Sequence, residues 1–487
     1  MKSKIEYVKF SYRSTMLTAD IDKVFTLLQP TSRMNGKIET RFKYALGCLM
    51  ATMHQAYEQD VEMSVSSYES NYMYKKGRYN KGEVSANIVR KLLSGLIENG
   101  FLIVTKDYSN QPKGRGHTRL YKATKKFYDM VSPPLVNKQH ECIRIKTKIS
   151  GKSSLIEYDD TPFLIRTRQS VNEYDEFMLQ FPVKGVNSAK LLINGTIEKC
   201  RLNTIAHRSF TDNENRGGRY AYGGISHLSM PRGYREGITI AGHPTVEYDF
   251  SALHVNIAYN TLGLTYKGND PYMDVFGFQD LHLRKVIKKS LLTAFNVGFD
   301  RSYRKSRANA VLAIKDALES DYQSEICRGY DAVHFQEILD RFGLTLKALL
   351  IKIEEYHKPI SKYFYSGEGI IFQNRDSAIM EYIIEAFKFY GIPILSVHDS
   401  VIVRQDISSE FVVSILKTAY FQMYRQDITI KSTKEKGKIM DRVQKLVKEF
   451  MPYEFVMNYR VGNYWMTKIV SSEYSWSSKN LPQREAV

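Results

Sequence analysis

The stretch TVEYDFSALHVNIAY, residues 245–259, decides how this chain is expected to fold. Val246, Tyr248 and Phe250 alternate with polar neighbours, which is the two-residue period of a strand with one buried face. The strand ends just after Asp249, and an apolar helical pattern follows. A carboxylate on rigid backbone at a strand end suits a metal ligand. Taken alone, Asp249 also has a simpler interpretation, as a cap of the following helix.

A second stretch, FYGIPILSVHDSVIVRQD, covers residues 389–406. Two apolar runs, 392–397 and 401–403, are interrupted by the polar step His398-Asp399-Ser400. This pattern predicts two strands joined by a tight hairpin turn. Aspartate is common in turns for local reasons, so this stretch alone does not establish a function for Asp399.

A third stretch, RKVIKKSLLTAFNVG, covers residues 284–298 and predicts a helix. Arg284 and Lys288 lie four residues apart and therefore project from one face. Eight Lys or Arg and one acid lie between residues 284 and 307. A solvated basic face is the usual interpretation of such a run, and a phosphate-binding helix is the more specific one. The apolar positions of the helix are Val286, Leu291, Leu292 and Phe295.

In this order the three stretches resemble motifs A, B and C of the family A DNA polymerases and the related single-subunit phage and mitochondrial RNA polymerases. Motif A corresponds to Asp249-Phe250-Ser251, motif B to the helix from Arg284, and motif C to His398-Asp399-Ser400. The resemblance covers roughly residues 215–405. It implies an α+β right-hand polymerase fold, with a palm built on an antiparallel sheet and with helical fingers and thumb.

The resemblance also implies site residues. Asp249, Asp399 and the main-chain carbonyl of Phe250 would hold two Mg²⁺ ions, with Mn²⁺ as a possible substitute, for phosphoryl transfer. Arg284 would bind the incoming nucleoside triphosphate, and Lys288 would stabilise the leaving group. The remaining substrate contacts implied by the family are Arg219, Arg235, Gln373 and His398.

Two positions depart from the family pattern. Five residues after Asp249 the DNA polymerases have Glu and the RNA polymerases Gly, whereas this chain has His254, a candidate sugar gate. Eight residues after Lys288 both branches have Tyr, whereas this chain has Asn296. We expect Phe295 or Phe299 to take over the stacking role of that tyrosine.

The N-terminal part predicts a DNA-binding module. Helical patterns at 39–57 and 84–99, the second beginning at the cap Ser85, are followed by a strand, a Pro/Gly-rich turn and a second strand. This order resembles a winged helix-turn-helix. A helical packing module with a solvated basic hairpin is the alternative. The expected DNA contacts are Arg90 and Lys91 on the helix and Lys113, Arg115 and Arg119 on the wing.

Composition favours a polyanionic partner: the 487 residues carry a formal net charge of +18. The four cysteines are scattered without metal-ligand spacing, no secretory signal is recognised and no run of 18 apolar residues exists, so we expect a cytoplasmic protein without a membrane anchor. The expected domains are a winged helix at 1–130, a linker at 131–154 with Pro133 and Pro134, and a polymerase domain at 155–487. Within the last we expect a thumb-like region at 155–240, motif A at 245–260, fingers at 270–350, motif C at 390–405 and a palm extension at 406–487.

These features favour a DNA polymerase acting in replication of a phage, plasmid or other mobile element, with DNA template and primer and nucleoside triphosphates as partners. A single-subunit RNA polymerase or primase is the first alternative, because Ser400 is closer to the RNA polymerase branch. A DNA-binding replication or regulatory protein with an inactive palm is the second.

Overall fold

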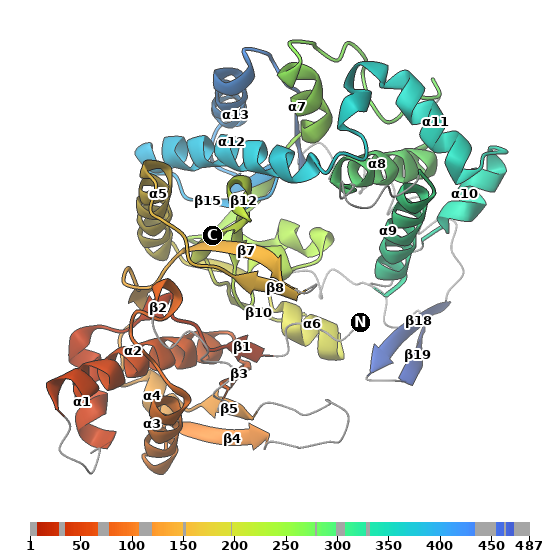
Figure 1. Cartoon of the computed structure of the whole chain (residues 1–487). Helices are drawn as coiled ribbons and strands as arrows, with labels where there is room; N and C mark the ends of the chain where they lie inside the picture. The colour runs from red at the N-terminus through yellow and green to blue at the C-terminus, as the bar shows by residue number, and fades with distance from the viewer. Residues whose placement is uncertain are drawn as a thin grey trace. The chain divides into compact units, whose positions relative to one another are not determined.

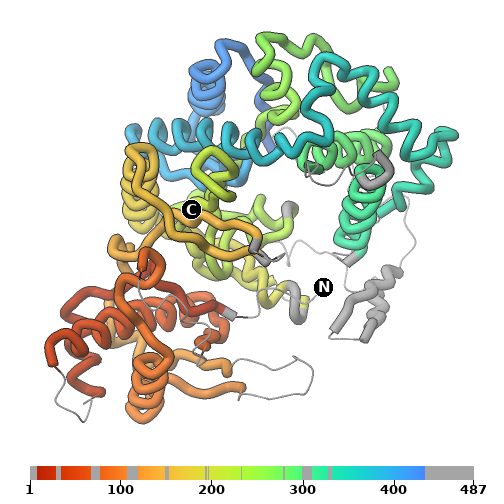
Figure 2. The backbone as a smooth tube through the Cα atoms, in the orientation of Figure 1, coloured from red at the N-terminus to blue at the C-terminus, as the bar shows by residue number. Residues whose placement is uncertain are grey.

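The computed structural model describes residues 7–28, 35–66, 77–106, 119–149, 152–195, 197–277, 280–298, 307–327, 332–433, 454–461 and 464–471. Figure 1 draws the others as a thin grey trace, and Figure 2 shows the course of the backbone in the same orientation. The chain is an α+β protein, as expected, and it divides into two compact units. The larger unit contains Ser3–Ser251 and Gln373–Lys431, and the smaller contains Ala252–Phe372 with Ser432–Val487 and Met1–Lys2.

The N-terminal part of the larger unit is built on helix α2 (Gly36–Glu58). The predicted apolar face of this helix is confirmed, since Leu46, Leu49 and Met53 are all at most 1% exposed. The cap at Ser85 is confirmed too, because its side chain accepts a hydrogen bond from the Ile88 amide at the start of α3 (Ala86–Glu98). The other elements are β1 (Tyr7–Lys9), β2 (Ser14–Thr15), α1 (Thr18–Leu28), β3 (Glu62–Ser64), α3 (Ala86–Glu98), β4 (Leu102–Lys106), β5 (Leu120–Ala123), α4 (Lys125–Tyr128) and β6 (Leu135–Val136). Strands β1, β3, β5 and β4 form a sheet in that order.

The segment 131–154, which we expected to be a linker, contains regular structure. It carries β6 and β7 (Ile143–Ile149) and begins β8 (Lys152–Leu155), and it buries Asn137, His140 and Glu141. Strands β12 (Asn213–Tyr222), β11 (Ala206–Thr211), β7 and β8 form a sheet in that order, with β7 and β11 parallel. The compact units therefore do not follow the expected boundaries near residues 130 and 155.

A buried ion pair joins the N-terminal part to the rest of the larger unit. The Arg13 guanidinium pairs with Asp175, and both side chains are at most 5% exposed. Arg13 also donates to the carbonyls of Asn137 and Ala206. These contacts connect residues up to 193 positions apart in the sequence, so the first described residues contribute to the core of the whole unit.

The sheet that carries the candidate motifs follows next. Its order is β10-β9-β13-β14-β16-β15, with β17 pairing with β14. The predicted strand of motif A is confirmed as β14, and the predicted hairpin of motif C is confirmed as β15 and β16. The bounds are β9 (Val183–Val186), β10 (Lys199–Arg201), β13 (Thr239–Ile240), β14 (His243–Phe250), β15 (Ile394–Val397), β16 (Ser400–Arg404) and β17 (Ile430–Ser432).

Helices pack on these strands in the larger unit, and Figure 1 shows α5 (Pro162–Leu179) and α12 (Gly369–Phe389) beside them. The Tyr174 hydroxyl of α5 donates to the carbonyl of Ile394 at 2.9 Å. Helix α12 (Gly369–Phe389) begins in the smaller unit and belongs to the larger one from Gln373 on. The other helices are α5 (Pro162–Leu179), α6 (Ser188–Asn194) and α13 (Ser409–Tyr424), with short 3-10 turns at Arg78–Asn80, His227–Ser229 and Arg232–Gly237.

The smaller unit is mainly helical. Its predicted helix from residue 284 is confirmed as α8 (Leu281–Asn296), which begins at the cap Asp280. The other elements are α7 (Leu253–Thr261), α9 (Arg307–Cys327), α10 (Phe335–Arg341), α11 (Leu346–Tyr356), a 3-10 turn (Lys358–Tyr363), β18 (Glu454–Val461) and β19 (Tyr464–Ser471).

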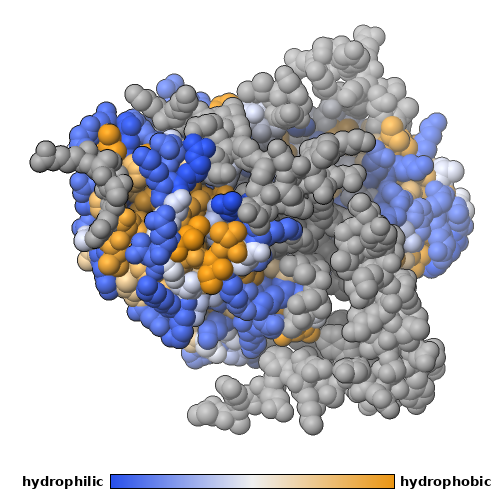
Figure 3. All heavy atoms as spheres, turned by 90° about the horizontal axis from the view of Figure 1, so that it is seen from below, coloured by the Kyte–Doolittle hydropathy of each residue, from blue (hydrophilic) through white to orange (hydrophobic). Residues whose placement is uncertain are grey.

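The described surface is mixed in character. On the face seen in Figure 3, hydrophobic patches lie among hydrophilic side chains. Phe389 is the most exposed large apolar side chain among those described, at 83%. No described helix is both long enough and apolar enough to cross a bilayer.

Candidate active site

The β14–β16 pairing brings the two candidate aspartates together. The strands are antiparallel, and Asp249 lies directly opposite Ser400, the residue after Asp399. The Phe250 amide donates to the main-chain carbonyl of Asp399 at 3.2 Å. Residues 150 positions apart in the sequence (399 − 249) are therefore neighbours at one end of the sheet. The sequence-based prediction of their proximity is confirmed at the level of strand register.

The turn that carries Asp399 has an unusual backbone. Val397 pairs with Ser400, so His398 and Asp399 form a two-residue hairpin loop. His398 has φ 51°, in the left-handed region that a β-carbon disfavours. Such conformations persist where the surrounding structure holds them and are common at functional sites. The surrounding protein and the positive charge of Arg219 lower the pKa of His398, which favours its neutral form.

Glu247 lies two residues before Asp249, on the same face of β14, but its carboxylate is fully engaged. Arg235 donates to it through two nitrogens at 3.1 and 3.0 Å, and the Ser400 hydroxyl donates to it at 2.7 Å. Both charged side chains are at most 14% exposed. Arg235, which the resemblance implied as a substrate contact, is therefore held by an internal partner. Glu247 was missed, although its spacing from Asp249 placed it on the same face.

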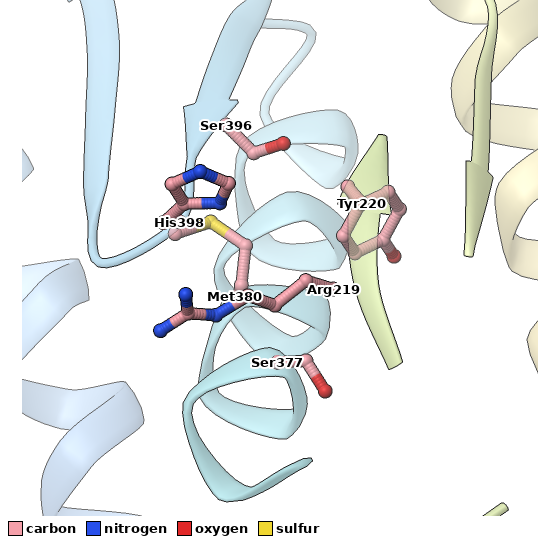
Figure 4. Close-up of a pocket in the computed structure, with 6 residues that line it drawn as sticks. All are labelled: Arg219, Tyr220, Ser377, Met380, Ser396 and His398. Carbon is pink, nitrogen blue, oxygen red and sulfur yellow. The ribbon is translucent and has the colours of Figure 1, made fainter. Parts of the chain in front are cut away.

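A small pocket adjoins the motif C turn (Figure 4). Arg219 from β12, Ser377 and Met380 from α12, and His398 from the turn converge on it. The Arg219 guanidinium forms an ion pair with the buried Asp376 of α12. The structure thus brings Arg219 and His398 to one pocket. Asp376 was missed, because nothing in the helical pattern marks one acid as the partner of Arg219. Gln373 lies one turn before Asp376 and is partly buried.

The smaller unit brings the two motif B cations to one aromatic ring. The charged groups of Arg284 and Lys288 lie 5.1 and 6.0 Å from the ring centre of Tyr272. Arg284 is further fixed by Asp270, to which its Nε donates at 2.8 Å. Burial alone would raise the pKa of Asp270, but hydrogen bonds led by the one from Arg284 lower it overall. Lys288 is exposed.

The residues that depart from the family pattern have different environments. Phe295 is fully buried and packs against Phe364 and Phe372, so its ring face is not available to a nucleotide, contrary to our expectation. Asn296 is exposed, and its amide donates to the Leu292 carbonyl at 2.7 Å. His254 is partly buried on α7, with its ring 6.0 Å from that of Phe372. Phe299 lies outside the described residues.

The predicted DNA-contacting residues of the N-terminal part are only partly described. Arg90 and Lys91 are exposed on α3. Arg119 is exposed just before β5, whereas Lys113 and Arg115 lie outside the described residues. The element order α3-β4-β5 agrees with the order predicted from the sequence.

The donor set at the end of β14 fits a hard divalent cation. Asp249 lies near the end of β14 and Asp399 in the turn just before β16, where the Phe250 amide bonds to the Asp399 carbonyl, and within the described residues no cation forms an ion pair with the Asp399 carboxylate. No group of three or more His, Cys, Asp or Glu side chains in the described ranges is arranged to hold a metal ion. Mg²⁺ commonly uses fewer protein ligands, one or two carboxylates completed by water and substrate phosphates.

Comparison with known proteins gives distant structural similarity only. No protein-family model matches the sequence, and no curated protein matches it. The POL domain of Pol1 from M. smegmatis, solved in complex with DNA primer-template and dNTP, is similar over 86% of this chain and 66% of that chain. The sequence identity is 10% and the TM-score 0.24. This chain thus spans slightly less than two thirds of that structure's length.

Proposed function

We propose that this protein is a template-directed nucleotidyltransferase, a DNA polymerase of the family A type. The observation that carries the proposal is the antiparallel pairing of β14 with β16, which makes Asp249 and Asp399 neighbours at one end of a sheet. Phosphoryl transfer to a 3′-hydroxyl needs two carboxylates in such a position and little covalent chemistry from the protein.

Asp249, Asp399 and the Phe250 carbonyl would hold Mg²⁺ at this site. When bound, the ions lower the pKa of the attacking hydroxyl and neutralise charge on the phosphates. The chain's own groups would bind and orient the substrates. Arg284, oriented by Asp270, is proposed to bind the triphosphate, and the exposed Lys288 to stabilise the departing pyrophosphate. Arg219 and His398 are proposed to contact the primer end.

Replacing Asp249 or Asp399 by Asn tests the proposal. Asn keeps the size of the side chain but removes the negative charge, so incorporation of labelled nucleotide on a primed DNA template should fall at least about a thousandfold, the scale of a lost charge-stabilising group. DNA affinity should change little. Asp406→Asn is the matched control, because that carboxylate is partly exposed and pairs with Arg404. Polymerisation at the wild-type rate by either active-site variant would refute the assignment.

The N-terminal part is proposed to be a winged helix that binds duplex DNA. Three observations support this: α3 precedes β4 and β5, their sheet has the order β3-β5-β4, and Arg90 and Lys91 are exposed on α3. Replacing both residues by Ala should weaken duplex binding and reduce the salt slope by about 0.9 for each phosphate that the variant no longer neutralises. A salt slope equal to that of the wild type would reject α3 as the DNA-contacting helix.

An RNA polymerase or primase is the second candidate. Ser400, which follows Asp399, is closer to the RNA polymerase branch, although its hydroxyl here donates a hydrogen bond to Glu247. Comparing dNTPs with rNTPs, with and without primer, separates the two candidates. Incorporation of rNTPs without primer would favour the second.

A further inference from the structure

One face of the sheet formed by β12, β11, β7 and β8 gathers basic side chains. The sequence of β7, Ile143–Ile149, is IRIKTKI, in which the isoleucines at 143 and 145 are buried and Arg144 and Lys146 face the other way. In the parallel pairing, Ser209 of β11 lies opposite Arg144. His207, two residues earlier on β11, therefore shares this face.

Arg144 is partly buried, and its environment differs from that of the other buried or partly buried arginines of the larger unit. Its Nη1 lies 3.1 Å from Nε2 of His207, and among the described residues neither Arg144 nor Lys146 pairs with a carboxylate. In contrast, the following arginines all pair with acids: Arg13, Arg78, Arg168, Arg201, Arg208, Arg219 and Arg235. A shielded guanidinium without an acid is costly unless another anion satisfies it.

The pKa shifts of His207, His140 and Lys146 show that positive charge exceeds negative charge around Arg144. Burial and the charge of Arg144 hold the pKa of His207 well below its usual value. Burial, together with Arg13, Arg144 and Lys81, lowers the pKa of His140 to about 3. Burial and Arg144 lower the pKa of Lys146 as well. A neutral His207 can accept the Arg144 hydrogen bond, which fixes one edge of the guanidinium and leaves its remaining N–H groups for a ligand.

We propose that Arg144 and Lys146, with Arg144 oriented by His207, form a binding site for a phosphate group of a nucleic-acid backbone. Arg matches the geometry of phosphate oxygens through paired N–H groups, and Lys adds a compact charge. The site lies on a different sheet from Asp249 and Asp399. It would bind nucleic acid whether or not the protein has the proposed polymerase activity.

The test compares two double variants with the same change in net charge. Arg144→Gln/Lys146→Gln removes the site, and Lys184→Gln/Lys199→Gln is the control, because both control lysines are exposed on β9 and β10. Binding of the full-length protein to fluorescein-labelled duplex and single-stranded DNA is measured by anisotropy at several salt concentrations, without nucleotide. The site variant should bind about tenfold more weakly than the control, with a salt slope smaller by about 0.7–0.9 for each phosphate that it no longer neutralises.

Equal affinity and salt slope for the two double variants would overturn the proposal. Lys146→Glu provides a second variant if the loss of Arg144 impairs folding, and reversing this charge should weaken binding at least as much. A thermal-shift arm with inorganic phosphate or a nucleoside triphosphate identifies the source of the phosphate. If these small anions stabilise the wild-type protein but not the site variant, and the two proteins bind DNA equally well, the ligand of the site is a free phosphate and not a backbone phosphate. Since nothing is incorporated in these measurements, inactivity of the protein as a polymerase would leave their outcome unaffected.

Discussion

At the scale of single residues, β14 carries two carboxylates with different tasks. Glu247 and Asp249 share one face of the strand, and Glu247 is held by the bidentate Arg235 and by the Ser400 hydroxyl. This arrangement joins β14, β16 and the turn at Arg232–Gly237 immediately beside the candidate metal ligands. We interpret Glu247 as the residue that fixes the position of the strand end, and Asp249 as the residue that meets the substrate.

Replacing Glu247 by Gln should therefore destabilise the protein. The largely buried Arg235 would lose its counter-charge, at a cost of about 1–3 kcal/mol. Urea unfolding measures this loss, and Glu236→Gln is the control because Glu236 is exposed. If the two variants were equally stable, the Arg235–Glu247 pair would not contribute to the stability of the strand end.

At the scale of elements, the β15–β16 hairpin combines a strained residue with a candidate ligand. His398 keeps φ 51° although a two-residue turn would form more easily with Gly at this position. Its ring lines the pocket that also contains Arg219 and Met380. The strain is retained where the imidazole reaches this pocket, which is consistent with a functional requirement for the side chain.

Replacing His398 by Gly should stabilise the hairpin and impair function. Relief of the left-handed strain is worth about 1 kcal/mol or more, whereas His398→Ala keeps the strain and should not be stabilised. Thermal unfolding of both variants, together with primer extension, separates the two effects. A Gly variant no more stable than the Ala variant would show that the turn is unstrained.

At the scale of the whole molecule, buried neutral histidines make the larger unit sensitive to acid. His140, His207 and His227 are at most 9% exposed. Burial is the first cause of the lowered pKa of each, to about 3 for His140 and about 4 for His227. Above the ordinary value of 6.5 neither the folded nor the unfolded state binds a proton at these groups. Below it only the unfolded state does, so stability must fall.

We expect the free energy of unfolding to fall between about pH 6.5 and pH 4, by up to about 1.4 kcal/mol per pH unit for each of these histidines. Urea titrations at pH 7, 6 and 5 measure the slope. In a His140→Asn variant the change in the free energy of unfolding per pH unit should be smaller by the contribution of one histidine. A stability independent of pH over this range would contradict the burial of these rings as neutral groups.

The sequence predicted the regular elements better than it predicted their partners. The alternation at 246–250 and the two apolar runs around His398 were sufficient for the motif strands, and the order of the motifs predicted that the aspartates would meet. Phe295 was misassigned, although its spacing of four from Leu291 had already placed it on the buried face of the helix. The IRIKTKI pattern of β7 was also missed, because two preceding prolines and the surrounding basic residues resembled a linker.

The pairing of individual side chains could not be predicted from the sequence, for a physical reason. The acids that neutralise Arg13 and Arg219, namely Asp175 and Asp376, are 162 and 157 residues away. Local periodicity specifies which face of an element is buried, but it does not specify which element covers that face. Only the assembled sheet order pairs these charges.

The discontinuous chain of the larger unit has a consequence for biosynthesis. Strand β14 is complete at Phe250, but β16, with which it pairs, begins at Ser400. At about 5–20 residues per second on the ribosome, roughly 8–30 s pass before that strand is made, and Ala252–Phe372 of the smaller unit is synthesised in the interval. Until then one edge of β14 is an open template for aggregation, and Asp249 has no second carboxylate beside it. Nascent chains stalled before Ser400 should therefore depend on chaperones and gain the two-carboxylate site only on release.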